Sequence, residues 1–532
     1  STDASSPGAS AAASATAAAA SADAASDEVS VVVFPELAVT GYTCADLFCS
    51  SVLPAESQKA IENIAARTAG LDIVSIIGAP LLLGDCLFNA AFVVNAGKII
   101  GVVPKSYHPN YREFYDKRWF AVPPKENRKI RLGGVEVPFG TNLLFDCGDN
   151  LVFGIELCED LWTTIPPSSY QALAGATACF NLSASNELVA KADYRRSLVS
   201  QQSARCIGAY IYAAAGVHES TTDVVFSGHS IIAENGAVIG EGERFKRDDA
   251  LLIADLDCEK LRAIRRSESS FADCAGRQHG HFEVIDVPVK RDLPLLEYTK
   301  IDPHPFVPND LSRRKERCHE IFNIQTAGLA KRFEHTGSEK AVIGISGGLD
   351  STLALLVCAE TFELLGYDRK NIVAVTMPGF GTTDRTYNNA VEMCRLIGAD
   401  LREIDIKESC LLHFDSIGHD PAVHDVTYEN VQARERTKVL MNIANRERGL
   451  VIGTGDLSEI ALGWSTYNGD HMSMYAVNCS IPKTLIRYII GWEAEQRGGR
   501  LKEVLEDIID TPVSPELLPN TGDAEINQKT EE

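Results

Sequence analysis

The stretch AVIGISGGLDS, residues 341–351, decides the fold of the second half of this 532-residue chain. Its apolar run predicts a buried strand, and the glycines that follow predict a tight turn into a helix. Strands are predicted again at 372–376 and 449–452, and helices at 311–333 and 386–397. Alternation of this kind indicates a doubly wound parallel sheet, in which ligands bind at the carboxyl ends of the strands.

The glycine turn within this stretch has the properties of a phosphate site. Its successive glycines let several backbone N–H groups point at one anion, and the start of the next helix adds a favourable dipole. Ser346 and Ser351 supply hydroxyl donors for the same oxygens. A Gly-Gly turn alone is more often structural, but the strand before it and the helix after it favour phosphate binding. The turn lacks a Gly-Lys-Ser/Thr sequence and is therefore not a Walker loop.

Asp350 in the same turn predicts a magnesium site. A carboxylate cannot bind phosphate directly because like charges repel, so a bridging Mg²⁺ is expected. The natural second carboxylate is Glu459, which follows another apolar strand in the segment GTGDLSE, residues 453–459. The alternative explanation of Glu459 is an exposed acid at a helix start.

The first half contains three polar residues that each follow a predicted strand. Short β-branched runs between residues 29 and 233 predict a strand-rich α/β domain. Glu36 stands in FPEL, Lys105 in VVPKSY and Cys158 in GIELCED, so we expect the three to converge on one sheet edge. The Lys105 charge would favour a Cys158 thiolate that attacks an amide, while Glu36 transfers protons. A single Cys after a strand is more often a buried structural thiol, but the other two motifs favour catalysis.

The composition excludes several classes of protein. A formal net charge of −23 argues against nucleic-acid and membrane-surface partners, since both are anionic. The 14 cysteines are dispersed without metal-ligand spacing, which is typical of reduced thiols in the cytoplasm. No uninterrupted apolar run is long enough to span a membrane.

The length and the changes in composition predict two domains. Residues 1–27 are a low-complexity Ala/Ser segment with little apolar surface, part of which could be helical. We expect a first domain at 28–287, a Pro-rich linker at 288–310 and a second domain at 311–532.

Six motifs in the second half, taken in order, resemble the large glutamine-dependent NAD⁺ synthetases. They are SGGLDS, MPGFGTTDRT at 377–386, ENVQARERT at 429–437, GTGDLSE, GWSTYNGDH at 463–471 and IPKTLI at 481–486. The glycine turn itself is similar to the pyrophosphate loop of the ATP pyrophosphatases, and the Glu-Lys-Cys motifs are similar to those of the nitrilase superfamily. The resemblance implies an α/β fold with a nitrilase-like αββα sandwich followed by a Rossmann-like doubly wound sheet.

The resemblance also implies the activity. Glutamine would be hydrolysed in the first domain, and its ammonia would convert deamido-NAD⁺, activated by Mg²⁺ and ATP as an acyl-adenylate, into NAD⁺. AMP, pyrophosphate and glutamate would be the other products. Small-molecule substrates and a homo-oligomer are expected. Two alternatives stay open, namely another glutamine-dependent amide synthetase of the ATP pyrophosphatase type and a catalytically incomplete fragment that binds partners.

Individual roles follow from the same resemblance. Glu113 is expected to orient Lys105, and glutamine contacts are expected from Tyr111, Glu159, Ser185 and Lys191. ATP and pyrophosphate contacts are expected from Ser346, Gly347, Gly348, Leu349, Asp350, Ser351, Met377 and Thr454. Deamido-NAD⁺ contacts are expected from Asn430, Arg434, Glu459, Trp464, Tyr467, Asp470 and Lys483, with Asp350 and Glu459 as metal ligands. Family members also have a further strand and helix before FPEL and a further segment after 520–532, so both ends are expected to be incomplete here.

Overall fold

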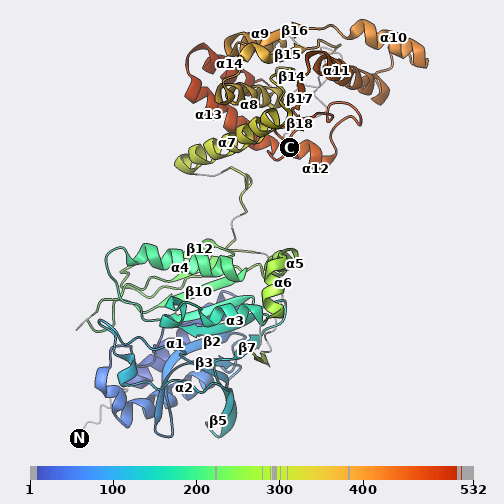
Figure 1. Cartoon of the computed structure of the whole chain (residues 1–532). Helices are drawn as coiled ribbons and strands as arrows, with labels where there is room; N and C mark the ends of the chain where they lie inside the picture. Colours follow the sequence, from blue (N-terminus) through green and yellow to red (C-terminus); the bar gives the residue numbers. More distant parts are fainter. Residues whose placement is uncertain are drawn as a thin grey trace. The chain divides into compact units, whose positions relative to one another are not determined.

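The structure is a computed structural model that describes residues 9–221, 224–277, 280–287, 289, 296–299, 301–307, 310–380, 384–511 and 517. The acidic tail at 520–532, much of the expected linker at 288–310 and positions 381–383 of the MPGFGTTDRT motif lie outside the described residues. The chain divides into two compact units, Ser1–Lys300 and Ile301–Glu532, and each is described by itself (Figure 1).

The first unit is built on two sheets. One has the strand order β1-β2-β3-β4-β6-β5 and the other the order β12-β11-β10-β9-β8-β7-β13. The strands are β1 (Val31–Val33), β2 (Val74–Leu83), β3 (Cys86–Asn95), β4 (Lys98–Pro104), β5 (Arg128–Leu132), β6 (Val135–Phe139), β7 (Leu143–Asp146), β8 (Val152–Leu157), β9 (Ala178–Ser183), β10 (Ala209–Ala214), β11 (Ile231–Glu234), β12 (Ala237–Glu241) and β13 (Glu283–Asp286).

Alternation along β2 explains why the two sheets stack. Val74 and Ile76 point to the second sheet and pack in one cluster with Phe153 and Ile155 of β8. The next residue, Ile77, points outward, where it packs against helix α2. Strands that are apolar on both faces need a cover on each side, and this produces a helix–sheet–sheet–helix sandwich.

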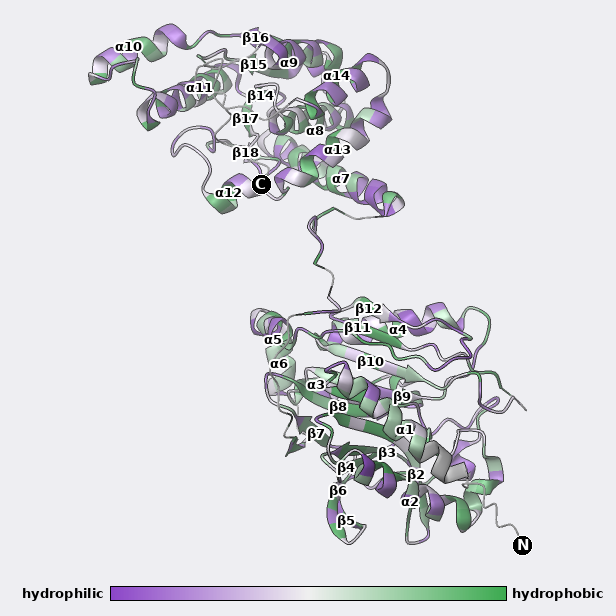
Figure 2. Ribbon diagram, turned by 180° about the vertical axis from the view of Figure 1, so that it is seen from behind, coloured by the Kyte–Doolittle hydropathy of each residue, from purple (hydrophilic) through white to green (hydrophobic). Residues whose placement is uncertain are grey.

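Helices cover both outer faces of the sandwich (Figure 1). Figure 2 shows hydrophobic strands in the interior of this unit and hydrophilic residues on outer helices such as α4. The helices and 3₁₀ turns are α1 (Ala9–Ser26), η1 (Ala45–Cys49), α2 (Val52–Arg67), η2 (Asp116–Arg118), η3 (Cys158–Trp162), α3 (Pro167–Leu173), α4 (Lys191–Cys206), α5 (Cys258–Ser267) and α6 (Ser269–Gly276).

The Ala/Ser segment forms most of helix α1, which packs beside α2. Low complexity predicted too little apolar surface for ordering, but the small side chains let the helix approach the sheet closely. Ser21 is buried, and its hydroxyl lies 2.9 Å from the Ser75 hydroxyl on β2. Ala24 is also buried, beside Val32 of β1. Close packing of small side chains therefore stabilises this helix without bulky apolar residues.

The second unit contains a parallel sheet with the order β16-β15-β14-β17-β18. From β14 the chain proceeds to one edge through β15 and β16, and it then returns to the other side through β17. The elements are α7 (Leu311–Thr336), β14 (Ala341–Gly344), α8 (Leu349–Leu365), η4 (Arg369–Asn371), β15 (Ile372–Thr376), α9 (Asp384–Ile397), β16 (Asp400–Glu403), α10 (Lys407–Ile417), α11 (Val426–Glu447), β17 (Leu450–Gly453), α12 (Leu457–Leu462), β18 (Tyr475–Ala476), α13 (Lys483–Arg497) and α14 (Gly499–Ile509).

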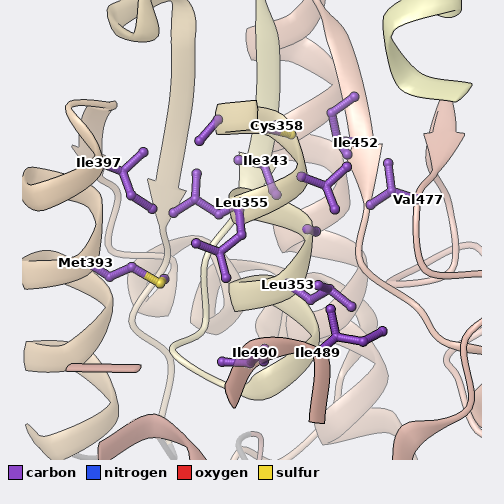
Figure 3. Packing of buried hydrophobic residues seen from close by; sticks show 14 of the residues in the cluster. Ile343, Leu353, Leu355, Cys358, Met393, Ile397, Ile452, Val477, Ile489 and Ile490 are labelled. Carbon is purple, nitrogen blue, oxygen red and sulfur yellow. The ribbon is translucent and has the colours of Figure 1, made fainter. Parts of the chain in front are cut away.

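Helices cover both faces of this sheet, so the predicted doubly wound α/β fold is confirmed. On one face Leu353 and Leu355 of α8 pack against Ile343 of β14 and against α13 (Figure 3). On the other face Val342 of β14 packs in a cluster with Phe414 of α10. The chain leaves β14 toward β15 on one side and later returns to β17 on its other side, so the strand order reverses at β14. In such sheets ligands bind at the point of reversal, beyond the carboxyl ends of the strands.

Candidate active sites

Three strands of the first unit bring the predicted triad together. The expected convergence on one sheet edge is corrected, because β1 and β4 belong to one sheet and β8 to the other. Glu36 follows β1, Lys105 follows β4 and Cys158 follows β8, and all three side chains are buried. The Lys105 Nζ donates a hydrogen bond of 2.6 Å to Glu36 Oε1. The charges of both Glu36 and Lys105 act on the Cys158 thiol. The structure thus places a base, a cation and a thiol in one buried cluster.

Glu36 is fixed by donors from both sheets. Asn89 Nδ2 on β3 donates to its Oε1 at 2.7 Å, and the backbone N–H of Ala184, just after β9, donates to its Oε2 at 2.9 Å. Gly78 on β2 lies directly beside the FPEL turn, because a Cβ there would come within 2.5 Å of the Pro35 carbonyl oxygen. The absence of a side chain at Gly78 therefore allows the turn that carries Glu36 to rest on the sheet.

Asp116, rather than Glu113, is the second carboxylate on Lys105. Its Oδ2 accepts a hydrogen bond of 2.8 Å from Lys105 Nζ, and its Oδ1 accepts one of 2.6 Å from the Tyr42 hydroxyl. Burial opposes the charge of Lys105, but Asp116 and Glu36 outweigh it and hold the Lys105 pKa well above its usual range. The sequence-based assignment of the lysine contact to Glu113 is therefore corrected: the chain turns at η2 and directs the residue eleven positions after Lys105 to the ammonium group.

The pKa of the Cys158 thiol lies above its usual range. Burial and then the Glu36 carboxylate raise its pKa to about 12, while Lys105 lowers it. Lys105 favours the thiolate, as the sequence predicts, but burial and the Glu36 charge outweigh its effect on the pKa. Burial also raises the pKa of Glu36, and Lys105 offsets part of that rise. The arrangement suits a base that accepts the thiol proton during attack.

A cavity of about 300 Å³ opens onto Cys158. Cations and anions both line it, as recognition of a zwitterionic α-amino acid requires. Its lining includes Cys158 and every residue expected to contact glutamine, together with Glu113: Tyr111, Glu113, Glu159, Ser185 and Lys191.

A hydrogen-bonded pair and a hydrogen-bonded set of three residues shape this cavity. The Tyr111 hydroxyl donates to both Glu159 oxygens, at 2.9 and 3.0 Å. Asn186 links the other charges, because its Nδ2 donates to Glu113 Oε1 at 2.7 Å and its Oδ1 accepts from Lys191 Nζ at 2.6 Å. Glu113 is therefore held as part of the cavity wall.

In the second unit the predicted phosphate turn follows β14 and begins α8. Gly347 has a left-handed φ of 87°, and a Cβ there would lie 2.2 Å from the Thr386 carbonyl oxygen, so only glycine fits. The Ser346 Oγ accepts from the Gly348 N–H at 3.2 Å and lies 3.3 Å from the Ser351 Oγ. Leu349 is the first residue of α8 and packs partly buried against the core. The turn presents hydroxyls and a helix N-terminus at the same point.

Three carboxylates gather beside this turn. Asp350, Asp456 and Glu459 each offer an oxygen, and these oxygens lie within 4.8 Å of one another. Burial and then the Asp350 charge raise the Glu459 pKa to about 7. Burial raises the Asp350 pKa to about 6, although Lys483 lowers it. Lys483 Nζ contacts Asp350 directly and lies 3.5 Å from Asp456 Oδ2 and 3.7 Å from Glu459 Oε1.

This cluster fits a divalent cation. Oxygen ligands from carboxylates are what Mg²⁺ prefers. Among the described residues, Asp350 Oδ1 and Asp456 Oδ2 are buried oxygens that accept no hydrogen bond. A cation bound there would satisfy both. Asp456 was not singled out from the sequence, where its visible signal is the Asp-x-x-Glu pattern that caps α12.

The GWSTYNGDH motif is tied to α11. The Thr466 hydroxyl donates to Asn430 Oδ1 at 2.8 Å, and Arg434 Nε donates to the Tyr467 carbonyl oxygen at 3.2 Å. Asp470 Oδ1 accepts from the Thr466 N–H at 2.8 Å. The Trp464 and Tyr467 side chains are exposed, by 56% and 81%. Exposed aromatic rings held on an ordered segment are available for stacking.

Two further predicted ATP contacts lie at the carboxyl ends of strands. Met377 follows β15, but its side chain is buried in a core cluster. Thr454 follows β17, and its carbonyl oxygen accepts from Asn478 Nδ2 at 3.1 Å. The same Asn478 amide donates to the Asp350 carbonyl oxygen at 2.9 Å. Asn478, which the sequence did not indicate, thus joins the two loops of the site.

Comparison with known proteins covers both units. The carbon-nitrogen hydrolase family matches residues 6–266, and the NAD synthase family matches residues 321–526. The glutamine-dependent NAD(+) synthetase of Mycobacterium tuberculosis is 44% identical over 517 residues, which are 94% of this chain and 75% of that protein. That of Mycobacterium leprae is 42% identical, over 95% of this chain and 76% of the relative. That of Thermotoga maritima is 30% identical, over 93% of this chain and 80% of the relative.

Among the helices of the described residues, none combines the length and the apolar character that crossing a bilayer would need.

Proposed function

Because the chain belongs to the family of glutamine-dependent NAD⁺ synthetases, we propose that it makes NAD⁺ from deamido-NAD⁺ and ATP with nitrogen taken from glutamine. The observation that carries the proposal is the buried cluster of Glu36, Lys105 and Cys158 at one cavity, in a chain whose other unit has a phosphate turn beside three carboxylates. A nitrogen donor site and a nucleotide site in one polypeptide fit an amide synthetase.

The first reaction would release ammonia. The Cys158 sulfur attacks the side-chain amide carbon of glutamine while Glu36 accepts the thiol proton. Two N–H bonds of Lys105 are used by Glu36 and Asp116, and the third faces the negative charge that develops on the amide oxygen. Glu36 returns the proton to the leaving nitrogen, so ammonia departs and a thioester forms. Water then attacks the thioester with Glu36 as base, releasing glutamate and restoring the thiol.

The cavity supports recognition of the amino-acid end of glutamine. Lys191 suits the α-carboxylate, and Glu159 and Glu113 suit the α-ammonium group. Tyr111 and Ser185 add hydrogen-bonding groups to the same wall.

The second reaction would activate an acid. The carboxylate of the nicotinate ring attacks the α-phosphorus of ATP, and pyrophosphate leaves into the turn at 346–351. Ammonia attacks the acyl-adenylate, AMP leaves and the carboxamide is formed. Trp464 and Tyr467 are suited to stack on the dinucleotide, and Arg434 and Lys483 to pair with its phosphates.

Mg²⁺ is part of this proposal. Asp350, Asp456 and Glu459 would hold it, and when bound it would neutralise charge on the departing pyrophosphate. Lys483, which contacts Asp350, would supply a second positive charge to the same phosphates.

A direct assay tests the proposed function. The protein is incubated with deamido-NAD⁺, ATP and Mg²⁺ and with either glutamine or ammonium, and NAD⁺ and AMP are measured. Cys158→Ala should abolish the glutamine-driven reaction and spare the ammonium-driven one. Equal loss of both would contradict the division of the work between the two units. NAD⁺ formed with neither nitrogen source added would point to contaminating ammonium.

Two alternatives predict different results in the same assay. Another amide synthetase of the ATP pyrophosphatase type would release AMP with a different acid and none with deamido-NAD⁺. A partner-binding fragment would give no turnover with any acid.

The remaining sequence-based predictions concern organisation. We propose that residues 288–310 link the first domain, which ends at 287, to a domain at 311–532, and limited proteolysis would test this. The expected start of the first domain at 28 is corrected, because helix α1 packs on its sheet. Assembly into a homo-oligomer and a cytoplasmic location stay predictions, and the mass of the protein in solution tests the first.

A further inference from the structure

Cys158 has an unfavourable backbone conformation for a residue with a side chain. Its φ is 41°, in the left-handed region that favours glycine. Neighbouring acceptors hold the peptide groups on its N-terminal side. The Leu157 N–H donates to Asp160 Oδ2 at 2.9 Å, and the Cys158 N–H donates to Asn181 Oδ1 at 3.2 Å. Such a conformation persists only where its surroundings determine it.

The Asp160 carboxylate also holds the segment after Lys105. Its Oδ1 accepts from the Tyr107 N–H at 2.8 Å, and its Oδ2 accepts from the Ser106 N–H at 3.3 Å. Asp160 is itself buried. The Cys158 turn leaves β8 of one sheet, whereas the Lys105 segment leaves β4 of the other. One carboxylate therefore joins the two turns across the sandwich.

We propose that Asp160 is a positioning residue of the glutaminase site, and that it fixes the Lys105 ammonium relative to the Cys158 thiol. This inference rests on the proposed function and adds to it a residue that touches neither glutamine nor the reacting atoms. Asp160 does not line the glutamine cavity. Its effect should therefore reach the reaction through the backbone of the two turns and through its charge, which interacts with that of Lys105.

A carboxylate suits this position better than any other short side chain. Three backbone N–H groups point at its two oxygens, so every contact is donor to acceptor. An amide of the same shape has one acceptor oxygen and one NH₂ group, and the NH₂ would face an N–H donor on one side. Asp160→Asn must consequently lose at least one contact. An amide oxygen at the Oδ2 position keeps the Leu157 and Ser106 N–H groups but turns the NH₂ group to the Tyr107 N–H, and the opposite orientation keeps only Tyr107.

The test compares Asp160→Asn with Asp85→Asn, an exposed aspartate in the turn between β2 and β3. A displacement of about 1 Å between reacting groups can lower a rate about 100-fold. We expect kcat for glutamine hydrolysis to fall by about that factor in Asp160→Asn, with KM changed less than threefold, and the Asp85→Asn variant to match the parent. A kcat within twofold of the parent, or a rise in KM as large as the fall in kcat, would overturn the inference.

A measurement on the unmodified protein decides the matter if Asp160→Asn does not fold. The Tyr107 N–H lies outside the strands, and its acceptor is Asp160. Its amide hydrogen should exchange at least 100-fold more slowly than that of an unstructured peptide, together with the Leu157 amide. Rapid exchange at Tyr107 would show that the link is not maintained.

These outcomes are distinct from failure of the proposed function. If the parent protein hydrolyses no glutamine, the proposed function of the first unit fails. If the parent hydrolyses glutamine and Asp160→Asn does so equally well, only the positioning role fails.

Discussion

The Lys105 Nζ lies 2.8 Å from Asp116 Oδ2, and both side chains are fully buried. This pair turns the expected triad of glutamate, lysine and cysteine into a set of four residues. The ammonium group is shared by two carboxylates, so its charge and its direction depend on both.

Asp116→Ala should therefore damage the first unit in two ways. Removing one partner of a buried ion pair leaves an uncompensated charge and costs about 3–5 kcal/mol of unfolding free energy. Glutamine hydrolysis should fall by at least about 100-fold, because Lys105 loses one of the groups that orient it. The control is Asp46→Ala, which removes a salt bridge to Arg118 in which both side chains are about 60% exposed. Asp46→Ala should change neither the unfolding free energy nor the rate of glutamine hydrolysis measurably. If Asp46→Ala and Asp116→Ala had equal effects, the role of Asp116 would be contradicted.

The raised pKa of Cys158 predicts how its alkylation depends on pH. With a pKa of about 12, the thiolate fraction increases about tenfold for each pH unit between pH 6 and pH 9. Iodoacetamide labelling of the peptide that contains Cys158, followed by mass spectrometry, should show this slope without a plateau. A plateau at neutral pH would reveal a preformed thiolate instead.

The carboxylate cluster predicts a loss of metal affinity in Asp350→Asn. Without that charge, the site keeps two carboxylates, and Lys483 keeps its weaker contacts with them. Mn²⁺ binding in the presence of ATP, measured by electron paramagnetic resonance, should weaken at least about tenfold, which is about 1.4 kcal/mol. NAD⁺ synthesis should fall while glutamine hydrolysis is unchanged. An unaltered Mn²⁺ affinity would remove Asp350 from the metal site.

Lys483→Met should increase the affinity for Mn²⁺ in the absence of nucleotide, whereas Asp350→Asn should lower metal affinity. The ammonium group lies among the three carboxylates and repels any second cation there. Without nucleotide, the variant should bind Mn²⁺ more tightly than the parent. ATP binding should weaken, because a charge for its phosphates is lost. Lys502→Met, whose ion-pair partners are Glu495 and Glu506, is the matched control.

Leu355→Ala tests the independence of the second unit's core. Leu355 is fully buried and packs with Ile343 and Ile490 (Figure 3). Removing such a side chain costs about 2–5 kcal/mol of unfolding free energy. Ammonium-driven NAD⁺ synthesis should be lost at a lower temperature, while glutamine hydrolysis keeps the thermal profile of the parent. A parallel loss of both would mean that the two units unfold together.

Much of the fold and of both sites was predictable from the sequence, because strongly apolar strands precede their functional residues. Glu36, Lys105 and Cys158 each follow such a strand. The edge strands β16 and β18 were not predicted, since DLRE is polar and β18 has only two residues. A partly helical Ala/Ser segment was predicted, but the packing of helix α1 on the sheet was not, because sequence patterns do not reveal that small side chains permit close approach.

The missed site residues share another physical reason. Asp116 reaches Lys105 through a turn, and the geometry of a turn is not recorded in strand or helix periodicity. Asp456 lies in the same GTGDLSE motif as Glu459, and the sequence does not show which of the two acids faces the site. Asn478 lies after a short edge strand and acts through backbone oxygens. These contacts between loops that are distant in the sequence could therefore be identified only from the structure.

The fixed surroundings of Glu36 have a consequence for the order of events. Its Oε1 already accepts from Asn89 and Lys105, and its Oε2 accepts from the Ala184 N–H. A carboxylate has about four acceptor positions, so one remains open, on Oε2. The thiol and the hydrolytic water must use that single position in turn. Water thus has no base until ammonia has carried away the first proton, and the geometry of one side chain imposes a strict sequence on the two halves of the reaction.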